Sequence, residues 1–125
     1  MVRDPFEEAE TPELAALLDA LSDPDCRELI SAIDSPMTAA ELSDVCDIPQ
    51  STTYRKLDQL SEATLLEELT EIRSDGRHTT RYAIAFENVD VGLDETRSFT
   101  VEITRPTRTA DERLARMWSE VQKEL

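Results

Sequence analysis

The sequence predicts an α+β fold in which helices come first and antiparallel hairpins follow. Up to about Leu60, apolar residues recur every three or four positions, as on the buried face of an amphipathic helix. From Leu66 onward they alternate with polar residues, which is the spacing of a strand with one buried face. An Asp-Gly pair at residues 75 and 76 supplies a tight turn between two alternating runs, so these runs are expected to form a hairpin.

The length and composition of the chain limit its architecture and its compartment. A chain of 125 residues has room for one main core, and we divide it into residues 11–86 and a smaller unit, residues 87–125. No apolar run reaches the ~18 residues of a membrane span, and the acidic N-terminus lacks the apolar region of a signal peptide. Cys26 and Cys46 are isolated thiols without the spacing of a zinc site or a disulfide scaffold. We therefore expect a cytoplasmic protein that does not bind membranes.

Acidic residues dominate the charge. Asp and Glu number 28 against 13 Lys and Arg, the net charge is −15, and only Lys56 and Lys123 are lysines. A compact domain with this charge repels itself unless salt screens the repulsion, and at ~1 M salt the Debye length falls to roughly 3 Å. The composition resembles that of proteins from halophilic archaea, which keep molar salt in the cytoplasm. An ordinary acidic protein is the alternative.

A capping residue followed by proline predicts the start of each of the first two helices. Thr11-Pro12 and Asp23-Pro24 each place an N-cap residue before a proline at the first helical position. Each start is followed by an apolar stripe at helical spacing, and Asp34-Ser35-Pro36 ends the second helix. The stripes are Leu14, Leu17, Leu18 and Leu21, then Cys26, Leu29, Ile30 and Ile33.

A pair of short helices joined by a turn follows. Thr38 and Glu41 have the spacing of a capping box, which predicts a helix start at this point. Pro49 ends that helix because proline disfavours helical backbone at the residue before it. Another helix is expected from Gln50 or Ser51 to about residue 62, and the pair forms a helix-turn-helix unit. The side chains predicted to point inward are Leu42, Val45 and Cys46 in the first helix and Thr53, Leu57 and Leu60 in the second.

Two hairpins and a last helix complete the prediction. The first hairpin runs from Leu66 to Arg73 and returns from Thr79 to Phe86. The second turns around Gly92 to Arg97, and Pro106 ends it. A capping box at residues 109–112 then opens a helix of about four turns. Its apolar stripe is Leu114, Met117, Trp118, Val121 and Leu125.

In this order, the elements resemble winged helix-turn-helix transcriptional regulators, the arsenic-repressor-like and related archaeal families in particular. Three stretches carry the resemblance by their order and spacing: Leu21 to Ile30, Thr38 to Leu42, and Ile48 to Leu60. The resemblance covers residues 14–86. It implies a winged helix-turn-helix fold in which the third stretch is the recognition helix and the first hairpin is the wing. The additional hairpin and a C-terminal dimerisation helix would follow.

Two departures from the family pattern bear on the site. Family members usually carry glycine in an Ala-Gly-Leu element after the recognition helix, where the chain needs a positive φ. Here that position is Thr64, a poor residue for a left-handed conformation. Metal-sensing members carry a paired-cysteine box at the start of the positioning helix, whereas Cys46 lies at the end of that helix without a second thiol. Metal sensing is therefore not expected.

The resemblance implies DNA binding, and the charge pattern supports it. Gln50 to Leu60 contains two basic residues and one acidic residue, and Ile72 to Ile84 contains three basic and one acidic. These stretches together carry +3, which leaves −18 on the rest of a chain whose total is −15. Net positive charge is thus found in the recognition helix and the wing, the two elements with which a winged helix contacts DNA, although the chain as a whole is acidic.

The candidate DNA contacts lie on the recognition helix and the wing. The N-terminal residues of a helix in the major groove meet base edges, so Gln50 can pair with adenine and Arg55 with guanine. Ser51 could instead cap the helix. Arg77 and His78 at the wing tip suit the minor groove or phosphate, with a solvated loop as the alternative. The full predicted set is Gln50, Ser51, Thr52, Tyr54, Arg55, Lys56, Arg73, Arg77, His78 and Arg81.

A homodimer is expected because one recognition helix offers few base contacts, and such regulators usually bind two half-sites symmetrically. The helices at both ends carry apolar stripes that the helix-turn-helix core does not need. Packing of the last helix on its own domain is the alternative. The predicted dimer interface is Leu14, Leu17, Leu18, Leu114, Met117, Trp118 and Val121.

Other functions are less well supported by the sequence. His78 is the only histidine, and the catalytic motifs of hydrolases, metalloproteases and phosphate-binding loops are missing, so no enzyme, cofactor or metal site is expected. A winged helix can also serve as a protein-interaction module without DNA binding, which the acidic surface favours. A redox-responsive regulator is the third possibility, because Cys26 lies in the first turn of its helix, where the dipole favours a thiolate. Its place on an apolar stripe favours inert packing instead.

Overall fold

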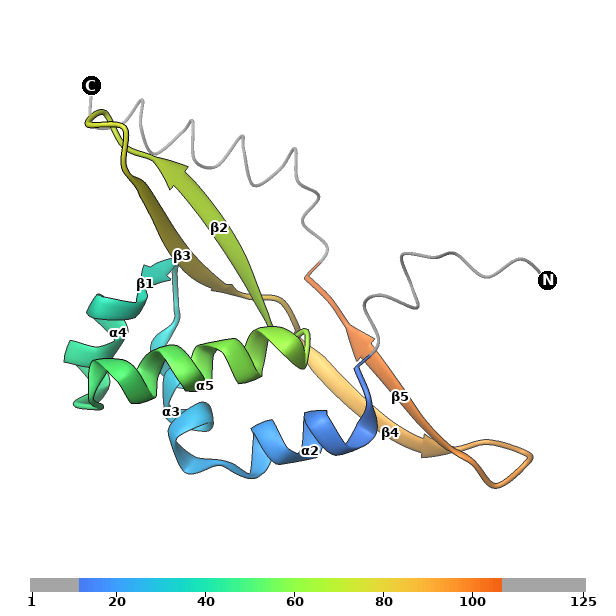
Figure 1. The fold of residues 1–125 in the computed structure, drawn as a ribbon. Coiled ribbons are helices and arrows are strands. Elements are labelled where there is room, and N and C mark those ends of the chain that lie inside the picture. The colour runs from blue at the N-terminus through green and yellow to red at the C-terminus, as the bar shows by residue number, and fades with distance from the viewer. Residues whose placement is uncertain (1–11, 107–125) are drawn as a thin grey trace.

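A computed structural model describes residues 12–106 and confirms an α+β architecture, with helices followed by antiparallel strands (Figure 1). In this part of the chain, two hairpins leave the helical body in different directions. The elements are α2 (Leu14–Ser22), α3 (Pro24–Ala32), β1 (Met37–Thr38), α4 (Ala39–Cys46), α5 (Gln50–Glu62), β2 (Leu66–Ile72), β3 (His78–Ile84), β4 (Asn88–Leu93) and β5 (Phe99–Thr104).

Capping residues set the starts of α3 and α4 as predicted. The Asp23 carboxylate accepts hydrogen bonds of 2.9 and 3.4 Å from the N–H groups of the second and third residues of α3, whose first residue is Pro24. At α4, the Thr38 hydroxyl accepts from the backbone N–H of Glu41 at 3.1 Å, and the Glu41 carboxylate accepts from the backbone N–H of Thr38 at 3.0 Å. Both local signals act through the orphan N–H groups of a helix N-terminus.

The first described helix begins later than predicted. Its N-cap is Glu13, which makes no side-chain capping bond, so α2 starts at Leu14 and Pro12 precedes it. The predicted stripe is also divided. Leu17 is fully buried in the core, so its assignment to a dimer interface is corrected, because a side chain without exposed surface cannot contact a partner. Leu14 is half-buried, and Leu18 keeps 48% of its surface exposed.

The core lies where α2, α3, α4 and α5 meet the base of the first hairpin. Thr53 is the one polar side chain fully buried in the described core, and its hydroxyl donates to the carbonyl oxygens of Pro49 and Ile48 at 3.1 and 3.4 Å. Val45, predicted to point inward, is 65% exposed, because the inner face of the eight-residue helix α4 is formed by residues 39, 42 and 46. The largest fully buried apolar side chains are Leu17, Leu29, Leu42, Leu57, Leu60, Leu65 and Cys26.

The strands form two separate antiparallel sheets. The first has the order β1-β3-β2, and its register runs from Leu66 opposite Ile84 at the core to Ile72 opposite His78 at the tip. The second consists of β4 and β5, which pair from Asn88 opposite Thr104 to Leu93 opposite Phe99. Half-buried side chains at the core end of the second sheet pack against the helical core, namely Val89, Val101 and Ile103.

Candidate nucleic-acid interface

The exposed side of α5 is built by the residues that its core does not use. Thr53, Leu57 and Leu60 anchor the helix, and Tyr54 on the other side is 48% exposed. Gln50, Ser51 and Arg55 are also exposed, while Thr52 and Lys56 are half-buried. The alternative in which Ser51 caps the helix is wrong, because the N-cap is Pro49 and no side chain caps this end. The N-terminal half of α5 therefore presents polar groups that packing does not occupy.

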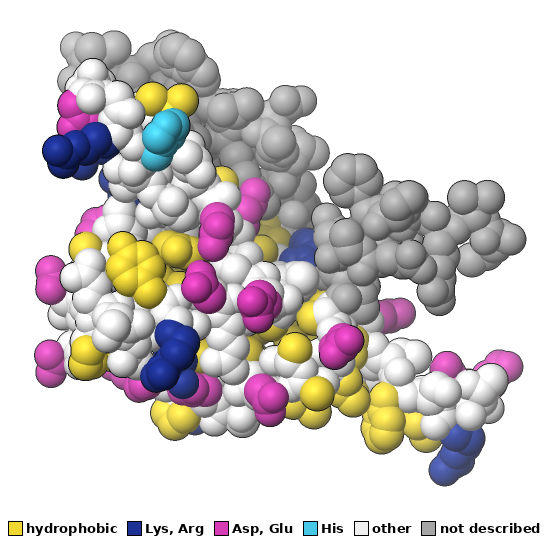
Figure 2. Space-filling model, viewed as in Figure 1, with side chains coloured by type: hydrophobic (Ala, Val, Ile, Leu, Met, Phe, Trp, Pro, Cys, Tyr) yellow, Lys and Arg dark blue, Asp and Glu magenta, His cyan; other side chains and the backbone are white. Residues whose placement is uncertain are grey.

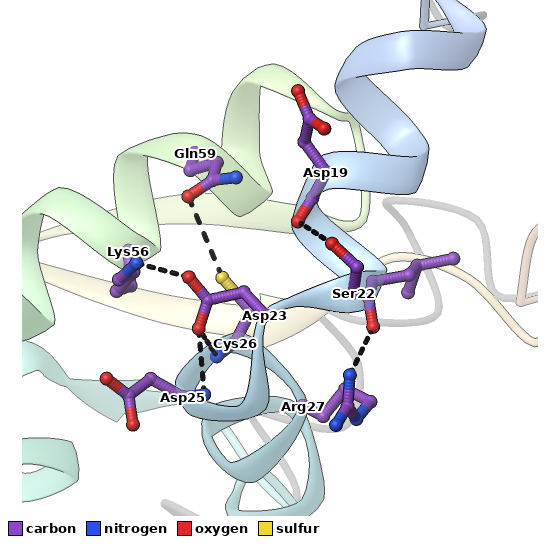
Figure 3. A network of polar contacts seen from close by, with 9 residues as sticks. Asp19, Ser22, Asp23, Asp25, Cys26, Arg27, Lys56 and Gln59 are labelled. Carbon is purple, nitrogen blue, oxygen red and sulfur yellow. Dashed lines mark hydrogen bonds and ion pairs between the residues drawn. The ribbon is translucent and has the colours of Figure 1, made fainter.

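Lys56 has a structural partner that the sequence did not reveal. Its ammonium donates to the Asp23 carboxylate, so it ties α5 to the capped start of α3 (Figure 3). This hydrogen bond lowers the pKa of Asp23, with further lowering from the two backbone N–H groups at the cap, and it raises the pKa of Lys56. With both side chains only 18% exposed, the positive charge of Lys56 is matched within the protein.

The tip of the first hairpin carries the basic groups predicted for the wing. Arg73, Arg77 and His78 are exposed there, and Ile72 is 73% exposed beside them. The turn is closed by the Arg73 N–H donating to the Arg77 carbonyl at 2.8 Å. Asp75 accepts from the Arg77 N–H at 3.0 Å. Figure 2 shows the single histidine next to basic side chains at this end of the molecule.

Arg81 lies in β3, nearer the core than the tip residues are, and two carboxylates hold its side chain. Its guanidinium donates to Glu71 of the paired strand at 2.9 Å and to Glu41 of α4 at 3.2 Å. The hydrogen bond to Glu71, aided by the nearby charge of Glu41, raises the pKa of Arg81. Arg81 thus connects the wing to the start of α4, and its charge is compensated.

The first hairpin is less basic than its stretch from Ile72 to Ile84 indicates, which corrects the predicted basic wing. Strand β2 adds three carboxylates before Ile72, namely Glu67, Glu68 and Glu71. The complete hairpin, residues 66–84, contains three basic and four acidic residues, a net charge of −1. Acidic side chains are accordingly spread over the face shown in Figure 2, whereas basic ones are confined to separate places. The exposed basic groups of the candidate interface reduce to Arg55, Arg73 and Arg77.

The connection between α5 and the wing has the left-handed geometry that the sequence placed in doubt. Thr64 has φ 61°, a strained value for a β-branched residue. The Arg105 guanidinium, just beyond β5, donates to the Thr64 carbonyl at 2.8 Å and to its hydroxyl at 2.9 Å. It also donates to the Ala85 carbonyl at 2.9 Å. One side chain from the second hairpin thus holds both ends of the wing, a role with no local signal in the sequence.

The two cysteines are part of the core. Cys26 is fully buried, and its thiol lies 3.9 Å from the Gln59 side-chain oxygen (Figure 3). Burial, aided by the negative charge of Asp23, raises the pKa of Cys26 to about 11. Burial likewise raises the pKa of Cys46. Within residues 12–106, no group of histidine, cysteine and carboxylate side chains is arranged to hold a metal ion.

Only part of the predicted dimer interface lies within the described residues. Leu14 and Leu18 lie on α2, where Leu18 is 48% exposed. The other predicted contacts, Leu114, Met117, Trp118 and Val121, lie outside the described residues.

Comparison with known families identifies the central part of this arrangement. Residues 21–68 match the helix-turn-helix domain family. The match covers 48 of the chain's 125 residues, and over this stretch the chain is similar to that family. The match runs from the end of α2 through α3, α4 and α5 into β2, and it supports a DNA-binding regulator with α5 as the second helix of the motif. None of the curated proteins matches the chain. No helix within residues 12–106 is long and apolar enough to cross a membrane.

Proposed function

We propose that this protein is a sequence-specific transcriptional regulator of the winged helix-turn-helix, arsenic-repressor-like type, without catalytic activity of its own. It acts on double-stranded DNA as a homodimer in the cytoplasm of a halophilic archaeon. The observation that carries the proposal is the match of residues 21–68 to a helix-turn-helix domain. The exposed N-terminal half of α5, which packing leaves free, supports it.

The two elements contribute different contacts. α5 enters the major groove, where Gln50 and Arg55 read base edges and Ser51, Thr52 and Tyr54 contact bases or phosphates. Arg73, Arg77 and His78 at the wing tip contact the minor groove or phosphate. Lys56 and Arg81 act mainly by holding α5 and the wing in place, because carboxylates already accept their hydrogen bonds.

The homodimer would place two recognition helices on half-sites about one DNA turn apart. Leu14 and Leu18 on α2 and the stripe of residues 114–121 remain the proposed interface. From the acidic surface we expect dimerisation and DNA binding to need salt, since ~1 M salt screens the repulsion between copies and between protein and DNA.

A gel shift with genomic fragments in molar potassium chloride tests DNA binding. We expect specific complexes, and Arg55→Gln should weaken them about 10- to 100-fold, because a guanine contact contributes about 1–3 kcal/mol. Arg27→Gln, which makes the same charge change on an exposed side chain of α3, is the control. If the Arg55 variant and the wild type bind DNA with equal affinity, then Arg55 makes no DNA contact and the proposed role of α5 is wrong.

The salt dependence of the same complexes provides a second prediction. Few exposed basic groups face the DNA, and the remaining surface repels it. Screening the repulsion should therefore offset screening of the attraction. We expect log affinity against log salt to be much shallower than a slope of about −3. A thousandfold loss of affinity between low and molar salt would contradict this charge argument.

A protein-interaction module without DNA binding is the second candidate function. The net charge of −1 on the wing and the compensated Lys56 and Arg81 favour it. Failure of every genomic fragment to bind in molar salt, with the protein folded, would select this candidate over DNA binding.

The redox alternative has a direct test. With its pKa raised to about 11 by burial, the Cys26 thiol is almost entirely protonated at neutral pH and is a poor target for peroxide. We expect wild type and Cys26→Ala to show the same DNA affinity with and without peroxide. A peroxide response that the substitution abolishes would restore the redox interpretation.

A further inference from the structure

The second hairpin has one continuous apolar face. Side chains directly opposite each other in an antiparallel pair lie on the same face, and alternate residues of a strand share that face. The register therefore places six apolar side chains together, and the other face carries polar residues and Gly92. The apolar pairs are Val89 with Ile103, Val91 with Val101, and Leu93 with Phe99.

The helical core covers only one end of this face. Side chains at the core end are half-buried against the core, but Val91 is 48% exposed, Leu93 49% and Phe99 70%. Leu18 of α2 is 48% exposed, and α2 packs against β5. Hydrophobic side chains extend from the helical body onto this hairpin in Figure 2. We call these four exposed side chains the tip patch: Val91, Leu93 and Phe99 on the hairpin and Leu18 on α2.

We infer that the tip patch is the docking site for residues 110–125 of a second copy of this chain, so that the two copies exchange their C-terminal segments. This inference rests on the proposed homodimer and names its contacts. The segment lies outside the described residues, and its sequence spaces Leu114, Met117, Trp118 and Val121 as one helical stripe. A helical stripe from Leu114 to Val121 spans roughly 10 Å. The exposed hairpin face from Val91 to Leu93 spans roughly 7 Å, and Leu18 of α2 adds to the patch, so the stripe is long enough to cover it.

Charge favours this segment over a second hairpin as the occupant. Residues 88–104 contain four acidic residues and one basic residue, so packing two hairpins face to face would bring together two units of net charge −3. The docking segment, residues 110–125, contains three basic and four acidic residues, a net charge of −1. It is thus an apolar stripe that meets the acidic hairpin with much less repulsion than a second hairpin would.

The path of the chain favours the segment of a second copy over the chain's own. β5 runs from the turn back to the core, where Arg105 is held by Thr64 and Ala85, so the chain leaves at the end remote from the tip patch (Figure 1). Only three residues, 107–109, separate Pro106 from the start of the predicted helix, and they reach at most ~10 Å. To dock on its own tip patch, the segment would have to reverse at once and run back over the half of the face that the core already covers.

The sole tryptophan, Trp118, reports on this contact by its fluorescence. In molar salt, we expect a dimeric mass by light scattering and a blue-shifted emission that moves to the red on dilution. Phe99→Asp should give a monomer with red-shifted emission at all concentrations. Ile72→Asp is the matched control, because Ile72 is equally exposed at 73% but lies on the first hairpin, and it should behave as the wild type. At 70% exposure, Phe99 can be replaced without disturbing the core.

Mixing two variants, each of which lacks one side of the proposed contact, tests directly whether the C-terminal segments are exchanged between copies. Phe99→Asp retains an intact C-terminal segment, and Trp118→Asp retains an intact tip patch but carries no tryptophan. Mixing the two variants should form one intact contact per pair, so the emission of Trp118 in the Phe99→Asp chain should shift to the blue. A segment docked on its own chain cannot produce this shift.

Three outcomes would overturn the inference. One is a dimer that survives Phe99→Asp, and another is blue-shifted emission from a monomer that dilution does not change, which would place the segment on its own chain. The third is a mixture of variants without any shift. All these readouts are taken without DNA, so they fail or succeed independently of the gel shifts that test regulation.

Discussion

The two hairpins share a topology but present opposite surfaces. Each is an antiparallel pair whose core end packs on the helices. The first ends in Arg73, Arg77 and His78, and apart from the exposed Ile72 its outer half carries polar side chains on both faces. The second keeps an apolar face up to Leu93 and Phe99. The backbone pairing therefore does not decide what a hairpin binds. The side chains beyond the reach of the core differ, and on them rest our proposals that the first hairpin binds DNA and the second binds protein.

The residue that joins the hairpins offers the largest expected effect. Arg105→Ala removes three hydrogen bonds, to Thr64 and Ala85, and should reduce the free energy of unfolding by about 2–4 kcal/mol. Arg105→Lys keeps the charge but not the planar fork, so it should recover less than half of this loss. Urea denaturation in molar salt measures both. If the guanidinium holds Thr64 in its left-handed conformation, the loss should shrink in a Thr64→Gly background. If Arg105→Ala costs the same free energy of unfolding in the Thr64→Gly background, then Arg105 does not act by holding the left-handed turn.

Matched arginines at the two tips test whether only the first hairpin meets DNA. Arg77→Gln and Arg97→Gln make the same charge change at an exposed turn of each hairpin. We expect Arg77→Gln to weaken DNA binding by about 1 kcal/mol or more and to reduce the salt slope, because a phosphate or minor-groove contact is lost. Arg97→Gln should leave the affinity unchanged in gel shifts. Equal losses from both would mean that the field of the whole protein, and not a contact, sets the affinity.

The two turns should also differ in their response to acid, which is the smallest effect. The Asp94 carboxylate accepts hydrogen bonds from the N–H groups of Ser98 and Thr96, both at 2.9 Å, and these lower its pKa. Because the pKa is lowered, the ordering of this turn is complete above the ordinary value of about 3.9 and is lost as the pH falls through the lowered value. The protection of the Ser98 amide, measured as its exchange rate relative to the intrinsic rate at the same pH, should therefore fall in acid and be low at all pH values in Asp94→Ala. Asp75→Ala in the other hairpin is the control and should leave Ser98 unaffected.

Local signals predicted much of this fold because each acts over a few residues. The caps at Asp23 and at Thr38 with Glu41, the break at Pro49 and the Asp-Gly turn all involve neighbours in sequence, and all are confirmed. The expected buried positions of α5 are confirmed for the same reason, since helical period alone selects one face. The start of α2 was placed two residues early, because its proline precedes the helix and its N-cap has no capping side chain.

Only the tertiary structure decided which charges and apolar groups are free. The sequence marks Lys56 and Arg81 as basic, but Asp23, Glu71 and Glu41 come to them from distant positions and compensate their charges. It marks Leu17 and Leu18 as neighbours on one stripe, yet packing buries the first and exposes the second. It places threonine at a left-handed position without showing that Arg105, 41 residues away, holds it. These outcomes depend on contacts between distant parts of the chain, and local propensity and periodicity carry no information about such contacts.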